Sequence, residues 1–255
     1  MACAAENIIP CTVELGGKSP NIYFADVMDG EDEFIEKAVE GWCWASSTRV
    51  KSAPAIAGAI HESIYEPFME RVMAKVAQIR RGDPFDTDTM IGAQASRQQF
   101  DKILSYIKIA RDEAARSSPA ASAPASPRSW ITVIYSAHPD QGRNDMRSFQ
   151  EEIFGPVIGI TTFKDEAEAL AIANETQFGL GPASGRAILT WPIDGRGIKA
   201  GRVWTNCYHV YPAHAAFGGY KQSGVGRETH KMALNAYQQT KNLLVSYGTA
   251  PLGLF

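Results

Sequence analysis

The chain has 255 residues, 45% of them hydrophobic, and a net charge of −3, which allows one or two packed domains and gives no reason to expect nucleic acid. No stretch approaches the roughly 20 apolar residues of a membrane span, and the N-terminus lacks a secretory signal pattern. The four cysteines have no zinc-type spacing, so we expect no metal site, no membrane partner, and reduced thiols in a cytoplasmic protein.

The first half of the chain predicts strands and amphipathic helices. Residues 10–24 indicate a strand, a Gly-Gly turn and a second, apolar strand. Helices are expected at residues 31–44, 62–80 and 96–114, because apolar residues recur there at three- to four-residue spacing. The inward-facing residues would be Phe34, Ala38 and Val39 in the first helix, Ile64, Phe68, Val72, Val76 and Ile79 in the second, and Phe100, Ile103, Leu104 and Ile107 in the third.

The second half continues the alternation. Residues 157–163 predict a buried strand, residues 164–174 the helix that follows, and residues 243–247 a final strand. Strands that alternate with helices favour an α/β fold with a parallel sheet. Three stretches break the pattern, near residues 41–58, 116–140 and 182–197, and residues 117–127 have the composition of a disordered linker.

A short motif near the N-terminus has the character of a catalytic element. It reads Glu14-Leu15-Gly16-Gly17-Lys18-Ser19-Pro20. Paired glycines let a backbone approach a ligand closely, and a carboxylate on such a turn can act as a general base. Alone the motif is weak, since a surface acid beside an ordinary turn looks the same.

Three further motifs follow in order, at residues 151–156, 203–207 and 217–224. Together with the first, they closely resemble the C-terminal half of the NAD(P)-dependent aldehyde dehydrogenases. Residues 90–95 and 237–241 are similar to the microbial acetaldehyde dehydrogenase type. The resemblance implies an α/β catalytic domain, with a parallel sheet and flanking helices, that lacks most of the dinucleotide-binding domain.

The resemblance also implies a domain layout. Residues 1–14 would be a remnant of the cofactor domain, formed by its last strand and the approach to it, and residues 15–237 the catalytic domain. Residues 238–248 would be an oligomerisation strand that pairs with a neighbouring subunit of a homo-oligomer, and residues 249–255 a tail. Without the first half, the chain is expected to expose apolar surface and to aggregate.

The resemblance assigns roles around an NAD cofactor, with NADP not excluded. Glu14 matches the general base, and Leu15 and Gly16 the positions beside the nicotinamide. Glu152 resembles the carboxylate that binds the nicotinamide ribose, although the adjacent Glu151 competes for that role. Phe154 resembles the aromatic residue that packs on the nicotinamide ring, or else it packs in the core.

More distant residues complete the expected site. Gln99 and Lys102 match residues near the adenosine ribose, with a solvated helix face as the alternative. Phe217 resembles an aromatic residue that lines the aldehyde tunnel, with Asn206 and Cys207 close to it. An apolar wall of this kind suits a small aldehyde substrate.

The nucleophile of the family is missing. In aldehyde dehydrogenases a cysteine some thirty-odd residues after the first motif attacks the aldehyde, whereas residues 47–55 here contain no cysteine. A serine is a far weaker nucleophile than a thiolate, and Cys43 between two tryptophans is better explained as a packed apolar thiol. A thiol-independent esterase or an enzyme that uses Cys207 is a more distant alternative.

A shifted reading frame accounts for the loss. If the third base of each codon is joined to the first two bases of the next, residues 47–55 can be read as NQGEVCTC, the nucleophile segment of the family. The same rule permits VLTGGERA from residue 116 and AGVWTRD, then NLAYR, from residue 181. We therefore hypothesise that three short patches are read out of frame, with true divergence or a low-complexity insertion as the alternative.

The sequence thus predicts a family that oxidises a small aldehyde to its acid with NAD. The polypeptide as written is expected to lack dehydrogenase turnover. The alternative from another class is a catalytically silent remnant or a subunit-interaction protein.

Overall fold

A computed structural model describes residues 1–47, 56–80, 82–113, 116–117, 133–136, 144–181, 183–185 and 193–253. Within these residues the largest sheet has seven strands in the order β4-β5-β6-β3-β2-β8-β9, and all neighbours are parallel except the edge pair β4 and β5. In that order the strands are Arg116–Ser117 (β4), Val133–Ser136 (β5), Val157–Phe163 (β6), Ile56–His61 (β3), Pro20–Tyr23 (β2), Ala183–Gly185 (β8) and Trp204–Thr205 (β9).

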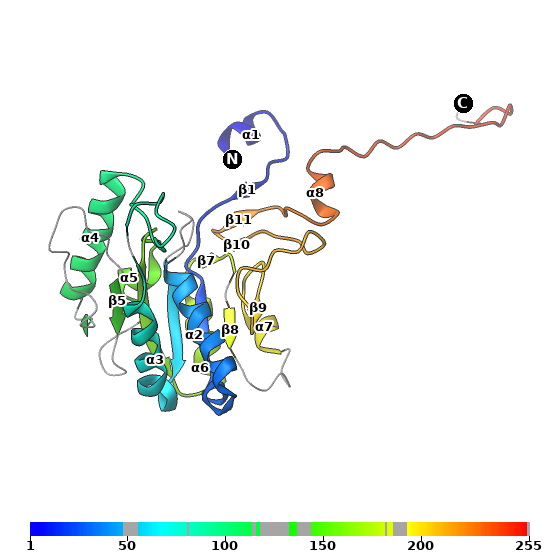
Figure 1. The fold of residues 1–255 in the computed structure, drawn as a ribbon. Helices are drawn as coiled ribbons and strands as arrows, with labels where there is room; N and C mark the ends of the chain where they lie inside the picture. Colours follow the sequence, from blue (N-terminus) through cyan, green and yellow to red (C-terminus); the bar gives the residue numbers. More distant parts are fainter. Residues whose placement is uncertain are drawn as a thin grey trace.

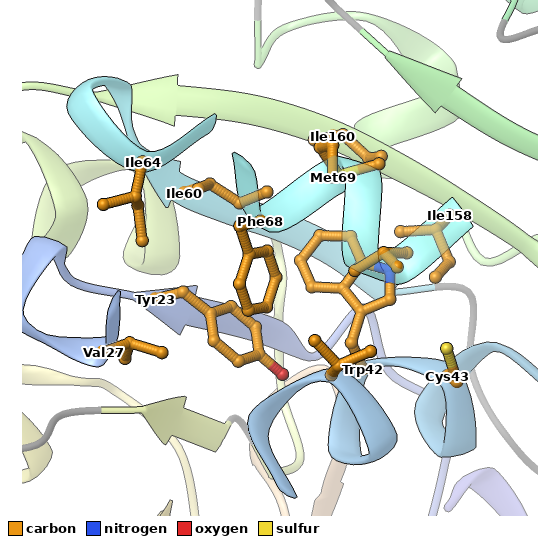
Figure 2. Close-up of a cluster of buried hydrophobic side chains, with 12 residues drawn as sticks. Tyr23, Val27, Trp42, Cys43, Ile60, Ile64, Phe68, Met69, Ile158 and Ile160 are labelled. Carbon is orange, nitrogen blue, oxygen red and sulfur yellow. The ribbon is translucent and has the colours of Figure 1, made fainter. Parts of the chain in front are cut away.

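Helices α2 (Asp32–Ser47) and α3 (Tyr65–Ala77) pack together against one face of this sheet (Figure 1). Alternate residues of the strands, such as Tyr23 and Ile60, point toward these helices because side chains of a strand alternate between its faces. Figure 2 shows the resulting core, in which the rings of Tyr23, Trp42 and Phe68 meet. Its buried members are Tyr23, Val27, Val39, Trp42, Cys43, Ile60, Ile64, Phe68, Met69, Val72, Ile158 and Ile160.

Trp42 fixes how closely α2 approaches the sheet. Its side chain is fully buried, and a Cβ atom built on Gly58 of β3 would overlap the indole ring. Only glycine at position 58 leaves room for the ring, so this pair holds helix and strand in contact.

The opposite face of the sheet is covered by α6 (Glu166–Glu175). Ile22 and Ala59 point to this side, next in sequence to the residues that face α2 and α3. Asp165 caps the helix by accepting a hydrogen bond of 2.9 Å from the backbone N–H of Glu168. The domain therefore has three layers, helix, sheet and helix.

A third cluster lies beside β6. Helix α4 (Arg97–Asp112) packs Ile103, Ile107 and Ala110 against Phe149 of the short helix α5 (Arg147–Gln150). This packing positions residues 151–154, which leave α5 and lead toward β6.

Two small antiparallel ribbons lie near the amino end of β2. Strand β1 (Val13–Glu14) pairs with β11 (Gly224–Val225), and β7 (Phe178–Gly179) pairs with β10 (Tyr220–Lys221). Figure 1 shows these ribbons together, between the large sheet below and helix α1 above. The remaining elements are α1 (Ala2–Glu6), η1 (Ala25–Asp29), η2 (Glu62–Ile64), α7 (Ile193–Gly197) and α8 (Met232–Asn235).

The predicted fold class is confirmed, and so are most of the elements. The helices expected at 31–44, 62–80, 96–114 and 164–174 are present, and the strand expected at 157–163 has those bounds. Within residues 1–13, helix α1 forms where only an approach to a strand was expected. Of the anomalous stretches, residues 48–55, 118–132, 137–140, 182 and 186–192 lie outside the described part of the chain, including the predicted linker after residue 117.

The strand predicted at residues 243–247 is wrong for the single chain. Residues 238–253 form no helix or strand, and Leu243, Leu244 and Tyr247 are exposed. Figure 1 shows the segment leading away from the body. A strand needs a neighbour to complete its hydrogen bonds, and this segment meets none within the described chain. In the same described ranges, no helix has both the length and the apolar character to cross a bilayer.

Candidate active site

Glu14 stands at the end of β1, opposite Gly224 of β11. The next residue, Leu15, donates its N–H to the carbonyl of Ser223 at 3.0 Å, so the ribbon holds the start of the turn. Partial burial, and then the neighbouring carboxylate of Glu228, raise the pKa of Glu14 above its usual range. A carboxylate with a raised pKa is a stronger base, which is the property that water activation requires.

The turn that follows contacts Glu152. The N–H of Gly17 donates to Oε1 of Glu152 at 3.2 Å, and a Cβ atom built on Gly16 would overlap the same carboxylate. Glycine at position 16 is therefore what allows this carboxylate to lie against the backbone of the turn. The first and second sequence motifs meet here, 135 residues apart.

Lys18, directly after the Gly-Gly turn, also joins the turn to the segment that leads to Glu152. Its side chain is 1% exposed, and its Nζ donates to the carbonyl of Ser148 in α5 at 2.7 Å. Burial lowers its pKa to about 7, although the charges of Glu152 and Glu151 oppose the shift. Sequence reasoning missed this residue, whose only signal was a lysine directly after the paired glycines.

Helix α4 clamps the segment that carries Glu152 and Phe154. Gln99 Nε2 donates to the carbonyls of Ile153 and Phe154 at 3.0 and 2.9 Å, and Lys102 Nζ donates to the carbonyl of Glu152 at 3.1 Å. Phe154 has a φ of +61° and is 37% exposed, so it is not a core residue. A left-handed conformation costs an L-residue about 1–2 kcal/mol, which these hydrogen bonds help to offset.

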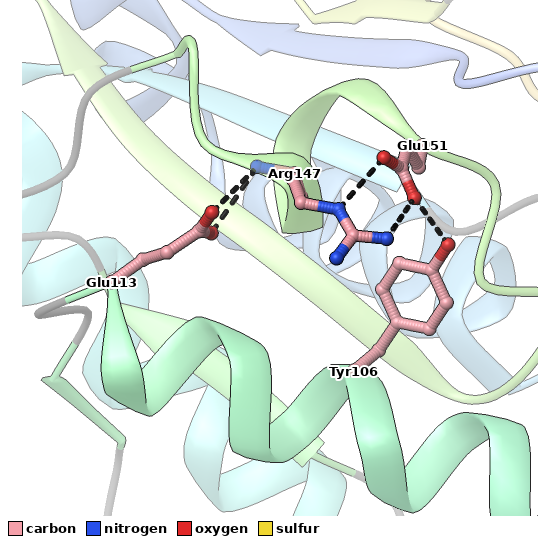
Figure 3. A network of polar contacts seen from close by, with 4 residues as sticks. All are labelled: Tyr106, Glu113, Arg147 and Glu151. Atoms are coloured by element: carbon pink, nitrogen blue, oxygen red, sulfur yellow. Dashed lines mark hydrogen bonds and ion pairs between the residues drawn. The ribbon is translucent and has the colours of Figure 1, made fainter.

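Glu151 has different partners from Glu152. Its carboxylate accepts hydrogen bonds from Arg147 at 2.9 and 3.0 Å and from the hydroxyl of Tyr106 (Figure 3). The Arg147 guanidinium, then the Tyr106 hydroxyl, hold the pKa of Glu151 below its usual range. The backbone N–H of Arg147 in turn donates to Glu113 at 3.2 Å. Of the two adjacent carboxylates, only Glu152 faces the turn after Glu14.

The predicted aldehyde-lining residues divide into two sets. Phe217 exchanges both backbone hydrogen bonds with Glu228, at 2.9 and 2.6 Å, which places it in the Glu14 region. Asn206 and Cys207 instead line a cavity of about 430 Å³ at the carboxyl end of β2, together with Tyr23, Phe34, Lys37, Ala38, Glu40, Gly41, Gly185, Tyr208, His209 and Val210. Phe217 is not among these lining residues.

The cysteines are all free thiols, and their surroundings differ. Burial raises the pKa of Cys43 to about 12, so it stays protonated and is unsuited to attack. Cys207 and Cys3 are exposed. Residues 48–55, where a family nucleophile would be expected, lie outside the described residues, and the sequence places no cysteine there. Among the described residues, no three His, Cys, Asp or Glu side chains group as metal ligands.

The aldehyde dehydrogenase family model matches residues 1–243, and this chain belongs to that family. It is 59% identical to an acetaldehyde dehydrogenase of Pseudomonas aeruginosa and 54% identical to an aldehyde dehydrogenase of Rhodospirillum rubrum. Each match covers 100% of this chain and 51% of the relative.

Solved structures of aldehyde dehydrogenases share the fold of this chain. Betaine aldehyde dehydrogenase of Staphylococcus aureus, in complex with NAD+, superposes with a TM-score of 0.89 at 30% identity, over 100% of this chain and 50% of that one. A mutant of the indole-3-acetaldehyde dehydrogenase of P. syringae, in complex with NAD+ and IAA, gives 0.85 at 32% identity, over 94% and 48%. The chain thus spans about half the length of the relatives it matches.

Proposed function

We propose that this chain carries the nicotinamide side and the aldehyde side of an NAD-dependent site for small aldehydes. The observation that carries the proposal is the contact of Glu152 with the Gly16–Gly17 turn directly after Glu14. NAD in complex with the structural neighbours, and the acetaldehyde dehydrogenase name of a relative at 59% identity, support the cofactor and the substrate class.

The residues present fit the nicotinamide end of NAD. Glu152 uses one carboxylate oxygen for Gly17, and its other oxygen remains to accept hydrogen bonds from ribose hydroxyls. Leu15 and Gly16 would bring backbone close to the nicotinamide ring, and the exposed face of Phe154 would pack on it. Gln99 and Lys102 hold the backbone of residues 152–154, and the family resemblance assigns them a place near the adenosine ribose. When bound, NAD supplies the hydride acceptor.

Glu14 would take a proton from water, and Phe217 would form an apolar wall for the aldehyde, while Asn206 and Cys207 line the cavity at the carboxyl end of β2. The chain as written nevertheless lacks the thiol that the family uses, so we predict no dehydrogenase turnover. A gene read out of frame in three patches explains this loss. The gene sequence tests that explanation: codons 47–55 must yield NQGEVCTC when read one base early.

Turnover is tested with the purified chain, acetaldehyde and NAD, by following NADH absorbance. We expect none, with the Pseudomonas aeruginosa relative as the positive control. NADH formation, or a covalent acyl adduct found by mass spectrometry, would show that the chain is a working enzyme.

Binding is tested separately with nicotinamide mononucleotide, which has the nicotinamide and its ribose but no adenosine. We expect Glu152→Gln to weaken binding at least tenfold, and Glu151→Gln, which changes the neighbouring carboxylate, to leave it within twofold. Equal effects of the two changes would contradict the assignment of Glu152.

A second candidate function, subunit interaction, is favoured by the exposed side chains of Leu243, Leu244 and Tyr247. We propose that residues 238–248 pair with a strand of a second copy of the chain. Size-exclusion chromatography tests this pairing, and a purely monomeric profile would contradict it.

A cytoplasmic location stays a prediction.

A further inference from the structure

The guanidinium group of Arg202 lies among the aromatic side chains of residues 204–217, the loop that carries Phe217. Its guanidinium carbon is 4.7 Å from the ring centroid of Tyr211, 5.0 Å from that of Phe217 and 5.7 Å from that of Trp204. These distances are in the range of cation–π attraction, so one cation contacts three aromatic side chains from residues 204–217.

The backbone of the loop also turns toward this cation. The Arg202 guanidinium donates to the carbonyls of Val210, Ala215 and Ala216 at 3.2, 3.3 and 3.4 Å. The indole N–H of Trp204 donates to the same Val210 carbonyl at 2.9 Å. The loop is thus fixed at both ends, just before Tyr211 and just before Phe217.

The same loop borders Glu14. Burial raises the pKa of Tyr211, and Glu14 adds to the shift while Arg202 opposes it, so the phenol lies within electrostatic reach of both. Phe217 pairs its backbone with Glu228, the carboxylate that acts on Glu14. A movement of the loop would therefore change the space beside the base.

We propose that Arg202 is a positioning residue that holds Tyr211 and Phe217 in place beside Glu14, as one wall of the aldehyde site. The inference rests on the proposed function, which assigns Phe217 to that site. A planar guanidinium can stack on rings and donate in several fixed directions at once, whereas the ammonium of lysine is a compact point charge. Lysine at this position would keep the charge and lose the geometry.

Hydrogen exchange of the full chain tests whether Arg202 holds the loop. The N–H of Ala215 bonds to Pro212 and that of Phe217 to Glu228, at 3.0 and 2.9 Å, so both amides should exchange slowly. We expect Arg202→Met to speed exchange of these two amides at least tenfold and to leave β6 unchanged. Unchanged exchange in the loop would overturn the proposal.

The matched control is Arg97→Met, because Arg97 also stacks on a ring, that of Phe100 at 5.7 Å, but on the distant helix α4. It should leave the loop unaffected. If Arg202→Met also loosens β6, Arg202→Lys decides: exchange in the loop should still rise severalfold with the sheet intact. Full protection in Arg202→Lys would show that charge alone suffices and would overturn the proposal.

The role of this wall in ligand selection is tested with acetamide and hexanamide, unreactive carbonyl analogues of a short and a long aldehyde, titrated by NMR. We expect the wild-type chain to favour acetamide, and Arg202→Lys to change the affinity ratio at least threefold. An unchanged ratio would overturn the positioning role of Arg202 at the aldehyde site. Failure of the wild-type chain to bind either amide would contradict the proposed aldehyde pocket itself, a result distinct from unchanged exchange in the loop.

Discussion

The ammonium group of Lys18 lies 2.7 Å from the carbonyl oxygen of Ser148, so a buried charge joins the turn after Glu14 to the end of helix α5. This contact places Glu152, two residues beyond α5, beside Gly17. Two segments that are far apart in sequence thereby form one edge of the candidate site.

Stability should depend on pH through Lys18. Its pKa falls from 10.5 to about 7 on folding because of burial, so between these values the unfolded chain binds more protons than the folded chain. The free energy of unfolding should therefore rise with pH across that window, by at most about 1.4 kcal/mol per pH unit. Below pH 7 Lys18 is protonated in both states, so the free energy of unfolding no longer changes with pH through this residue.

Replacement of Lys18 by methionine should remove that slope. Urea unfolding at several pH values between 7 and 10 measures the difference between the two chains. If the stability difference between wild type and Lys18→Met stays constant over this range, the lysine does not titrate on folding as described.

The pKa of Glu14 should fall when Glu228 is neutralised. Burial is the larger cause of its raised pKa and would persist, so Glu228→Gln should lower the titration midpoint without restoring the ordinary value. Carboxyl NMR shifts of Glu14 measure this. Glu151→Gln, on the Arg147 network, serves as the control and should leave the midpoint unchanged.

Trp42 should be among the most costly side chains to remove. It is fully buried between α2 and the sheet and contacts Tyr23 and Phe68, with ring centroids 5.3 and 5.9 Å away. Trp42→Ala should cost about 3–5 kcal/mol of unfolding free energy, measured by chemical denaturation. Tyr247→Ala, at a side chain that is 93% exposed, should change it by less than about 0.5 kcal/mol. A loss below about 1 kcal/mol in Trp42→Ala would contradict the packing shown in Figure 2.

Removal of residues 238–255 should separate folding from assembly. The described side chains of this segment are exposed, so the melting temperature of the monomer should be retained. Self-association, followed by analytical ultracentrifugation, should disappear. Association that persists without the segment would assign the interface to another surface.

Periodicity predicted the body of the fold because burial dictates it. The apolar spacing of Phe68 and Val72 marks the face of α3 that meets the core, and the nearly continuous burial of β6 reflects a strand covered on both faces. Helix α1 was missed because residues 2–6 bury no face, so no pattern marks them. Residues 243–247 show the opposite case: their apolar composition favours a strand, but the described part of the single chain supplies no partner strand for them.

The site was predictable only in part. The Gly-Gly turn and the segments 203–207 and 217–224 were predicted from their motifs. Glu151 and Glu152 look equivalent in the sequence, and only the structure shows that the first binds Arg147 and the second Gly17. Arg202 and Glu228 carried no signal, because their importance comes from contacts with residues 8 to 14 positions away or across a ribbon. Such contacts exist only after the loop has closed.

The position of β2 has a consequence for biosynthesis. On one side it pairs with β3, but on the other it pairs with β8, in which Gly185 is the register partner of Tyr23. That flank of the nascent chain stays unpaired until residue 185 has left the ribosome. Pairing over such sequence separation is slow, so newly made chains should depend on chaperones that shield open strands during translation.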